Sequence, residues 1–201
     1  MILVLIGPHG AGKSTLGQVL AARLGVPFHG ELGRSLALDP AWRPPGGTAA
    51  DPALAFDQEL FARELARDLG ARGPRGAHRP RIVETWHPGN LAYATRRSPQ
   101  VVAAWLPALA RACRHADAVV LPLDAPRPVL ARRQSEPGDL DFFREVGAAA
   151  LGWAQALGLA CLPTLQTDLD SPELLAGLVL GRLGGALHSP TDPRRPTCEW
   201  S

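Results

Sequence analysis

The chain has 201 residues, and its 21 Lys and Arg against 19 Asp and Glu leave a formal charge of +2. A chain of this length buries enough apolar surface to fold as one soluble globular domain without disulfides or structural zinc. The near-zero charge argues against a dedicated nucleic-acid-binding domain, whose surface would be strongly basic. No apolar run approaches the roughly 18–20 residues of a membrane span, so we expect neither nucleic acid nor a membrane as a partner.

The cysteines and the N-terminal segment both favour a cytoplasmic protein. Cys113, Cys161 and Cys198 are widely spaced and form no Cys-x-x-Cys pair, which is typical of free thiols in a reducing compartment. The apolar run at residues 2–6 is too short for a signal peptide and has no basic segment before it.

Hydrophobic patterning predicts strands and helices that alternate along the chain. Residues 2–6 are a continuous apolar run rich in branched side chains, which is typical of a strand buried on both faces of a parallel sheet. The predicted strands are residues 2–6, 26–29, 81–84, 117–124 and about 159–165. The predicted helices are near residues 16–24, 54–69, 91–97, 101–114, 127–134, 140–157 and 172–183. This alternation implies an α/β fold with a mainly parallel five-stranded sheet covered on both faces.

Proline and glycine mark the loops. They are concentrated in residues 40–52, where we expect a mobile surface loop, and in the turn at residues 70–80. Ser171 is predicted to cap the last helix, with Pro172 at its first position. The chain beyond this helix has no apolar period, so we expect one domain at residues 1–184 and a poorly ordered tail at residues 185–201.

A phosphate-binding motif lies between the first strand and the first helix. GxxxxGK[ST] is matched by Gly7-Pro8-His9-Gly10-Ala11-Gly12-Lys13-Ser14, and Thr15 follows. In such a loop the backbone N–H groups and the helix N-terminus bind phosphate, the lysine neutralises phosphate oxygens, and the hydroxyl ligates Mg²⁺. Lys13 is the only lysine in the chain. Residues 7–15 therefore predict a P-loop NTPase fold that binds ATP and Mg²⁺, with Lys13 on the phosphates and Ser14 on the metal.

Carboxylates are predicted at the ends of three strands. Glu31, Glu84 and Asp124 each follow a strand, and ligands of an open parallel sheet bind beyond the carboxyl ends of its strands. Such carboxylates can hold Mg²⁺ and take a proton from an acceptor hydroxyl. For Asp124, which precedes Ala125 and Pro126, a helix cap is the preferred interpretation.

Several segments resemble, in order and spacing, the thymidylate kinases and the related deoxynucleoside kinases. They are residues 7–15, 84–93 (ETWHPGNLAY), 123–124 with 129–133 (LD and VLARR), and 141–146 (DFFREV). The resemblance spans roughly residues 2–183. It implies a three-layer α/β/α P-loop kinase fold with a short lid, and phosphoryl transfer from ATP to a nucleoside or nucleoside monophosphate. It also implies a homodimer formed through the helices that follow the third strand.

The resemblance assigns roles to charged residues. Glu84 falls at the acid of the family's Asp-Arg or Glu-Arg motif and is predicted to act near the transferring phosphate and on the metal. Arg132 and Arg133 fall at the start of the arginine-bearing lid, and because they cannot face the same way on a helix we expect at most one to reach the γ-phosphate. Glu31 and Arg34 fall in the turn that contacts the acceptor.

The residues after Glu84 are predicted to bind the acceptor. Stacking surface and hydrogen-bonding groups are offered by Trp86, His87, Asn90 and Tyr93. Core packing is an equally good interpretation of Trp86 and Tyr93. Arg97, or its neighbour Arg96, is predicted to replace a guanidinium that the family carries where this chain has Thr85. His9 is interpreted as a loop side chain rather than a catalytic base.

Departures from the family keep other acceptors open. Besides Thr85, the chain has Ala94 where the family has Gln, and its lid after Arg133 is short. Residues 31–34 (ELGR) also resemble the Glu-x-x-Arg of ribosylnicotinamide-kinase-like proteins, and a sugar or coenzyme precursor is open as well. Two competing hypotheses concern proteins that are not kinases: a regulatory NTPase that only hydrolyses the nucleotide, and a nucleotide sensor without turnover. A guanine-binding Asn-Lys-x-Asp motif is impossible with one lysine, and a sensor would leave the strand-end carboxylates without a role.

Overall fold

The computed structural model describes residues 1–43, 51–73, 78–133 and 139–187, with residues 185–187 described by their backbone alone. Its helices and strands, in chain order, are β1 (Ile2–Ile6), α1 (Lys13–Leu24), β2 (Phe28–His29), α2 (Leu32–Ala37), α3 (Pro52–Gly70), β3 (Arg81–Glu84), α4 (Trp86–Arg97), α5 (Pro99–His115), β4 (Ala118–Asp124), α6 (Arg127–Arg133), α7 (Leu140–Ala156), β5 (Ala160–Cys161), β6 (Leu165–Gln166) and α8 (Pro172–Leu187).

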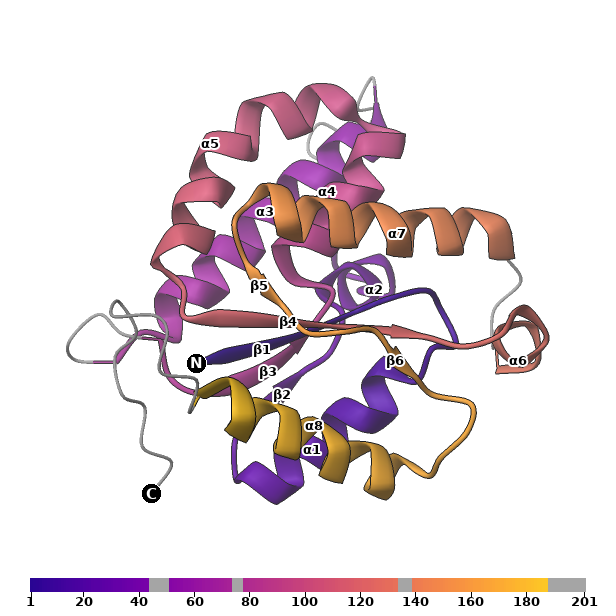
Figure 1. The fold of residues 1–201 in the computed structure, drawn as a ribbon. Coiled ribbons are helices and arrows are strands. Elements are labelled where there is room, and N and C mark those ends of the chain that lie inside the picture. The colour runs from indigo at the N-terminus through magenta and orange to yellow at the C-terminus, as the bar shows by residue number, and fades with distance from the viewer. Residues whose placement is uncertain (44–50, 74–77, 134–138, 188–201) are drawn as a thin grey trace.

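The strands form a parallel sheet in the order β2-β3-β1-β4-β5, and β6 pairs with the end of β4 (Figure 1). Leu5 of β1 is in register with Glu84 of β3, and Ile6 of β1 is in register with Pro122 of β4. The loop after β1 therefore lies at the carboxyl edge of the sheet, beside the carboxylate that ends β3. The predicted α/β fold with a parallel five-stranded sheet is confirmed.

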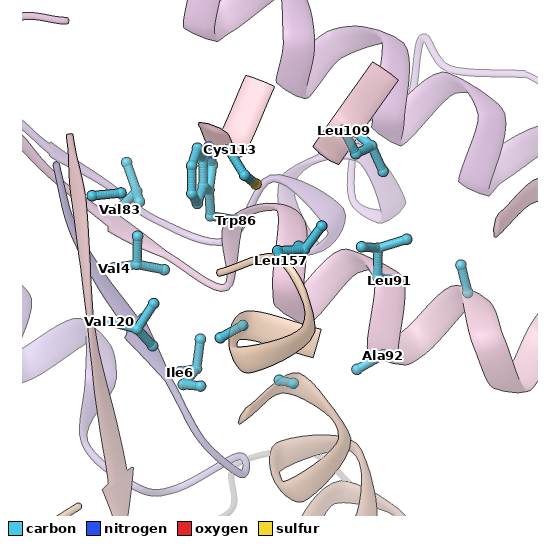
Figure 2. Close-up of a cluster of buried hydrophobic side chains, with 14 of the residues drawn as sticks. Val4, Ile6, Val83, Trp86, Leu91, Ala92, Leu109, Cys113, Val120 and Leu157 are labelled. Carbon is cyan, nitrogen blue, oxygen red and sulfur yellow. The ribbon is translucent and has the colours of Figure 1, made fainter. Parts of the chain in front are cut away.

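Helices cover both faces of this sheet. Helices α3, α4, α5 and α7 pack on one face, and α1 and α8 pack on the other (Figure 1). In β1, Ile2, Val4 and Ile6 enter the first core, whereas Leu3 and Leu5 enter the second. A strand buried on both faces needs apolar side chains at every position, which explains the continuous run at residues 2–6. Figure 2 shows the first core, where side chains of the sheet, including Val4, Val83 and Val120, meet Trp86, Leu91 and Leu109.

The predicted strand near residues 159–165 is two short strands. β5 pairs with β4 at Val120↔Cys161, and β6 pairs with it at Leu123↔Leu165. Pro163 lies between them, and proline has no N–H to donate to a sheet ladder.

Helix α4 begins at Trp86 rather than at the predicted residue 91. Pro88 does not prevent this earlier start, because it lies in the first turn, where an N–H group has no intrahelical partner. Thr85 and Trp86 both adopt positive φ values, of 70° and 47°. The turn leaves no room for a side chain at Gly89, whose Cβ would lie 2.3 Å from Thr85 Cγ2. A strained turn of this kind costs free energy and must be held by its surroundings.

Two differences from prediction lie on either side of the loop predicted at residues 40–52. Helix α2 was not predicted as an element, and α3 begins at Pro52, where the Asp51 side chain accepts from two backbone N–H groups. Residues 44–50 of the predicted loop lie outside the described residues.

The last helix begins as predicted and ends later than predicted. Ser171 Oγ accepts from Leu174 N over 3.3 Å, so Ser171 caps α8. The helix continues to Leu187, so residues 185–187 are helical and not tail, while residues 188–201 lie outside the described part of the chain. Where the domain ends stays a prediction.

Two further expectations concern thiols and membranes. Cys113 and Cys161 are free, as predicted, and burial raises the pKa of the Cys113 thiol to about 12. Cys198 lies outside the described residues. None of the helices in the described part of the chain is long and apolar enough to cross a membrane.

Candidate active site

The loop between β1 and α1 forms a cradle of backbone groups. Gly7 has a φ of 139°, and a Cβ there would lie 2.1 Å from the Leu123 carbonyl oxygen, so glycine is required. Gly12, the N-cap of α1, has a φ of 82°. No side chain caps this helix end, so the N–H groups of its first turn face the cleft without a side-chain partner. A helix N-terminus of this kind binds phosphate.

Lys13 is a buried cation in this cradle. Its side chain is 6% exposed, and its Nζ donates to the carbonyl oxygens of Gly7 (3.0 Å) and Pro8 (3.1 Å). Burial lowers the pKa of the Lys13 ammonium, and the nearby Glu84 and Glu31 carboxylates oppose that effect. A buried ammonium whose charge is disfavoured gains stability when an anion binds beside it, and the phosphates of a nucleotide supply such an anion.

Glu84 lies between Lys13 and Ser14. Its Oε2 accepts from Ser14 Oγ over 2.9 Å, and its Oε1 is 3.9 Å from Lys13 Nζ. Burial raises the pKa of the Glu84 carboxyl, against the effects of Lys13 and Ser14. A hydroxyl and a carboxylate are the oxygen donors that Mg²⁺ accepts. The described residues contain no cluster of three or more His, Cys, Asp or Glu side chains that could hold a metal. Ser14 and Glu84 thus fit a Mg²⁺ ion, for which phosphate oxygens and water would supply the remaining ligands.

A cleft of about 750 Å³, which we name the loop cleft, opens over these residues. It brings together residues from the loop after β1, from α1, from the ends of β2 and β3, and from α2 and α6. The predicted residues among those that line it are His9, Gly10, Gly12, Lys13, Ser14, Thr15, Glu31, Arg34, Glu84 and Arg133. Gln18, Phe28, Gly30 and Ser35 line it without having been predicted as site residues.

A second cavity, of about 350 Å³, adjoins the loop cleft, and we name it the aromatic pocket. Three residues, His9, Glu31 and Arg34, line both cavities. The remaining lining is mostly aromatic or apolar: Phe56, Leu60, Tyr93, Phe142, Phe143, Leu38, Ala37 and Gly33, together with Asn90 and Arg97. The two phenylalanines of α7 belong to a segment that resembles the kinase family, but no role had been predicted for them.

His9 forms the boundary between the two cavities. Its ring stacks on Phe143 with 4.0 Å between centroids and 10° between planes. Its Nε2 is hydrogen-bonded to the Tyr93 hydroxyl over 2.8 Å and lies 4.0 Å from Glu31 Oε2. Burial raises the pKa of the Tyr93 phenol, so this hydroxyl stays protonated. His9 is therefore a structural part of the aromatic pocket and not only a loop side chain.

Arg97 and Asn90 line the aromatic pocket, and both donate hydrogen bonds to carboxylates of α3. Arg97 Nη2 donates to Asp57 Oδ1 over 2.6 Å, and its guanidinium lies 5.2 Å from the ring of Phe56. Asn90 Nδ2 donates to Glu64 Oε2 over 3.3 Å. Both side chains are thus fixed in place by buried carboxylates. Arg96 instead pairs with the exposed Glu145 and lines neither cavity.

Trp86 and His87 are not brought into either cavity, which corrects their prediction as acceptor-binding residues and confirms the alternative interpretation of Trp86 as a core residue. Both are fully buried, and both are hydrogen-bonded to Asp68 of α3. Trp86 Nε1 donates to Asp68 Oδ1 over 3.2 Å, and His87 Nε2 is hydrogen-bonded to Asp68 Oδ2 over 2.7 Å. Arg81 Nη2 also donates to Asp68, over 2.5 Å. Because α4 begins at Trp86, these two side chains point back toward α3.

Only one of the two lid arginines faces the loop cleft. Arg133 lines it and donates to Thr167 Oγ1 (3.2 Å) and Thr167 O (2.9 Å). Arg132 is exposed and lines none of the cavities described above. The short lid at residues 134–138 lies outside the described residues. Asp124 accepts from the backbone N of the next residue, Ala125, over 2.9 Å, which is not a bond to an N–H group of α6, so the capping interpretation stays a prediction.

Comparison with known proteins assigns the chain to a family. A family model described as an AAA domain matches residues 2–162. The chain belongs to this family. A curated relative, the shikimate kinase of Ruegeria pomeroyi, is 34% identical over 108 residues, which are 53% of this chain and 51% of that protein. The match therefore spans about half of each chain.

Two solved structures share the fold of this AAA-domain chain. The YorR protein of Bacillus subtilis, in complex with phosphorylated GDP, has a TM-score of 0.56 and 18% identity, with 94% of this chain and 99% of that chain covered. A deoxyadenosine kinase from M. mycoides with bound dATP has a TM-score of 0.60 and 11% identity, with 92% and 100% covered. At this identity the likeness shows the fold alone. The predicted P-loop superfamily is confirmed, and the finer resemblance to thymidylate kinases stays a prediction.

Proposed function

We propose that the protein is a small-molecule kinase that transfers the γ-phosphoryl group of ATP to a nucleoside or a nucleoside monophosphate. The observation that carries this proposal is the junction of two cavities. The loop cleft, with Lys13, Ser14 and Glu84, suits a triphosphate and its metal, and it opens into an aromatic pocket that suits a planar acceptor.

The donor side neutralises and positions phosphate groups. The first-turn N–H groups of α1 and the Lys13 ammonium bind phosphate oxygens, and Ser14 with Glu84 would hold Mg²⁺, which supplies charge neutralisation. Thr15 lies beside this site at the cleft wall. Arg133, held by Thr167, is the arginine positioned to stabilise charge on the γ-phosphoryl group.

The acceptor side binds a ring and deprotonates the attacking group. Phe142, Phe143 and Tyr93 offer stacking surface, while Glu31 and Arg34 lie where the two cavities meet. A carboxylate at this junction can take a proton from the acceptor. Such a site has a role only if a second molecule binds, which distinguishes a kinase from a regulatory NTPase or a nucleotide sensor.

A second acceptor class is favoured by one observation, the 34% identity to a shikimate kinase over half of the chain. The alternative is therefore a small hydroxyl-bearing acceptor other than a nucleoside, and a ribosylnicotinamide-like molecule, a sugar and a coenzyme precursor stay open within that class. A homodimer through α4 and α5, and residence in the cytoplasm, are further proposals that the resemblance implies.

The test is ADP release from Mg·ATP across nucleosides, nucleoside monophosphates, ribosylnicotinamide, shikimate and small alcohols, with Lys13→Ala as the blank. Acceptor-dependent ADP, together with a phosphorylated product seen by mass, is the expected result. ADP released equally without any acceptor would support a regulatory NTPase. Tight ATP binding without turnover would support a sensor.

A further inference from the structure

Three buried carboxylates follow one face of α3. Asp57, Glu64 and Asp68 are 0%, 1% and 3% exposed, and their spacing of seven and four residues places them on the same side of the helix. Each of them is hydrogen-bonded to α4, and the pairings are Asp57 with Arg97, Glu64 with Asn90, and Asp68 with Trp86 and His87. The partners on α4 come in the reverse order, as in two antiparallel helices.

Two of these pairings end at the aromatic pocket. Arg97 and Asn90 line the pocket, whereas the partners of Asp68 line neither cavity. Asp57 and Glu64 line neither cavity themselves. These two carboxylates can therefore affect a molecule in the pocket only through the side chains that they hold.

Arg97 is held from three sides. Its Nη2 donates to Asp57 Oδ1 over 2.6 Å, and its guanidinium lies 5.2 Å from the ring of Phe56 and 5.3 Å from the ring of Tyr93. The second oxygen of Asp57 accepts from the Ser98 hydroxyl, which fixes the carboxylate itself. Because the guanidinium is already ordered, a ligand that binds to it has a smaller loss of side-chain entropy to overcome.

Glu64 fixes the direction of the Asn90 amide. Glu64 Oε2 accepts from Asn90 Nδ2 over 3.3 Å, and Glu64 Oε1 accepts from Arg67. Burial raises the pKa of the Glu64 carboxyl, and the charge of Arg67 opposes this. An ionised carboxylate only accepts hydrogen bonds, so the nitrogen end of the Asn90 amide points toward α3 and the oxygen end points away from it.

Stability alone gives little reason for a carboxylate at these two positions. Burying a charge has a large desolvation cost, and replacing a buried charged pair by apolar side chains of similar volume is often neutral or stabilising. An apolar side chain cannot fix the direction of a neighbouring polar group, because apolar burial is non-directional whereas a hydrogen bond is directional.

We infer that Asp57 and Glu64 are positioning residues of the acceptor site, which set the affinity for the acceptor by holding Arg97 and Asn90. This inference rests on the proposed kinase function, because it takes the aromatic pocket as the acceptor site. It gives α3 a part in acceptor binding that goes beyond the two side chains, Phe56 and Leu60, with which this helix lines the pocket.

Two variants of Asp57 test the inference with the acceptor that the wild type phosphorylates best. Asp57→Leu removes the bond to Arg97, whose side chain is 35% exposed and can still contact water. We expect the KM for the acceptor to rise by about 10–100-fold, with the KM for ATP unchanged. Asp57→Asn keeps an oxygen for Arg97, because the Ser98 hydroxyl can accept from the new amide nitrogen, and it should restore most of the acceptor affinity.

Glu64→Leu tests the second pairing independently. It frees the Asn90 amide and should also raise the KM for the acceptor and leave the KM for ATP unchanged. Glu59→Gln is the matched control on α3, because the Glu59 side chain is 37% exposed, pairs with Arg63 and lines neither cavity. Each variant is assayed at a temperature at which its circular dichroism spectrum matches that of the wild type.

The results separate this inference from the kinase proposal. A folded Asp57→Leu enzyme with the wild-type KM for the acceptor would overturn the inference and leave the kinase proposal standing. Equal rises in the two KM values would overturn it as well, and so would an Asp57→Asn enzyme as impaired as Asp57→Leu. If neither leucine variant folds, the carboxylates hold the fold and not the acceptor. If the wild type phosphorylates no acceptor, the kinase proposal fails and this inference fails with it.

Discussion

The side chain of His9 in the phosphate loop is hydrogen-bonded to the hydroxyl of Tyr93 on α4 over 2.8 Å. This bond joins the loop that binds the donor to the helix that lines the aromatic pocket. Tyr93 is the single tyrosine of the chain. Its ionisation can therefore be followed by absorbance without interference from other tyrosines.

Tyr93 is expected to titrate well above its ordinary pKa of 10 in the folded protein. Burial is the main cause, Glu31 adds to it, and Arg97 opposes it. The near-ultraviolet absorbance of tyrosinate should therefore stay low as pH rises through 10 in the folded chain, and should rise there in urea. A folded protein whose tyrosine titrates near its ordinary value would contradict the packing of Tyr93 against His9.

Arg133 and Arg132 form a matched pair of neighbouring arginines. Arg133→Ala should lower kcat/KM by about 10²-fold or more, because its guanidinium lines the loop cleft where charge develops on the γ-phosphoryl group. Arg132→Ala should leave kcat/KM near the wild-type value, because the Arg132 side chain lines neither the loop cleft nor the aromatic pocket. The measurement is steady-state kinetics of both variants. An equal loss of kcat/KM in the two variants would contradict the assignment of Arg133.

Glu84 predicts an acid limb in the pH profile. Burial raises the pKa of its carboxyl, while Lys13 and Ser14 oppose this. The ionised form is needed to hold Mg²⁺, so kcat/KM should fall as pH decreases through a value above the ordinary 4.5. The limb should be absent from the residual activity of Glu84→Gln. An unchanged limb in that variant would assign the titration to another group.

Asp68 is expected to stabilise the turn after Glu84. Its burial tends to raise its carboxyl pKa, but the hydrogen bond and charge of His87 and the charge of Arg81 outweigh this, and the net pKa is lowered. Asp68→Asn leaves Arg81 without its buried anion and should reduce the free energy of unfolding by about 3–5 kcal/mol at pH 7.

The pH dependence of this loss provides its control. A carboxyl whose folded pKa lies below the unfolded value stabilises the protein above the unfolded pKa, and this stabilisation disappears as pH falls through the folded pKa. The difference between wild type and Asp68→Asn in urea unfolding should thus shrink below about pH 4. Asp141→Asn, at an exposed ion pair with Arg127, should cost about 1 kcal/mol or less. Equal losses at Asp68 and Asp141 would contradict this account.

The parts of the site that could be predicted from the sequence are those set by local order along the chain. Lys13 and Ser14 follow the buried strand β1 and begin α1. Glu84 ends β3, which pairs with β1. Strand order and glycine spacing are enough to place these three residues at one edge of the sheet.

The parts that could not be predicted depend on contacts distant in sequence. Trp86 and His87 turn away from the cavities because their partner, Asp68, lies on α3, and no local pattern marks that pairing. Thr167 holds Arg133 from the residue after β6, a two-residue strand too short to leave a periodic signal. His9 occupies a variable position of the motif, so only the fold reveals its contact with Tyr93.

The most direct test of phosphoryl transfer uses ATP labelled with heavy oxygen in its γ-phosphoryl group, incubated with Mg²⁺, the acceptor panel and either wild type or Lys13→Ala. The account predicts the labelled phosphoryl group on an acceptor in the wild-type reaction, and a loss of about 10²-fold or more in Lys13→Ala, which should keep the wild-type circular dichroism spectrum. Label found only in inorganic phosphate, with every acceptor unchanged, would contradict it, as would a Lys13→Ala variant that transfers phosphate at the wild-type rate.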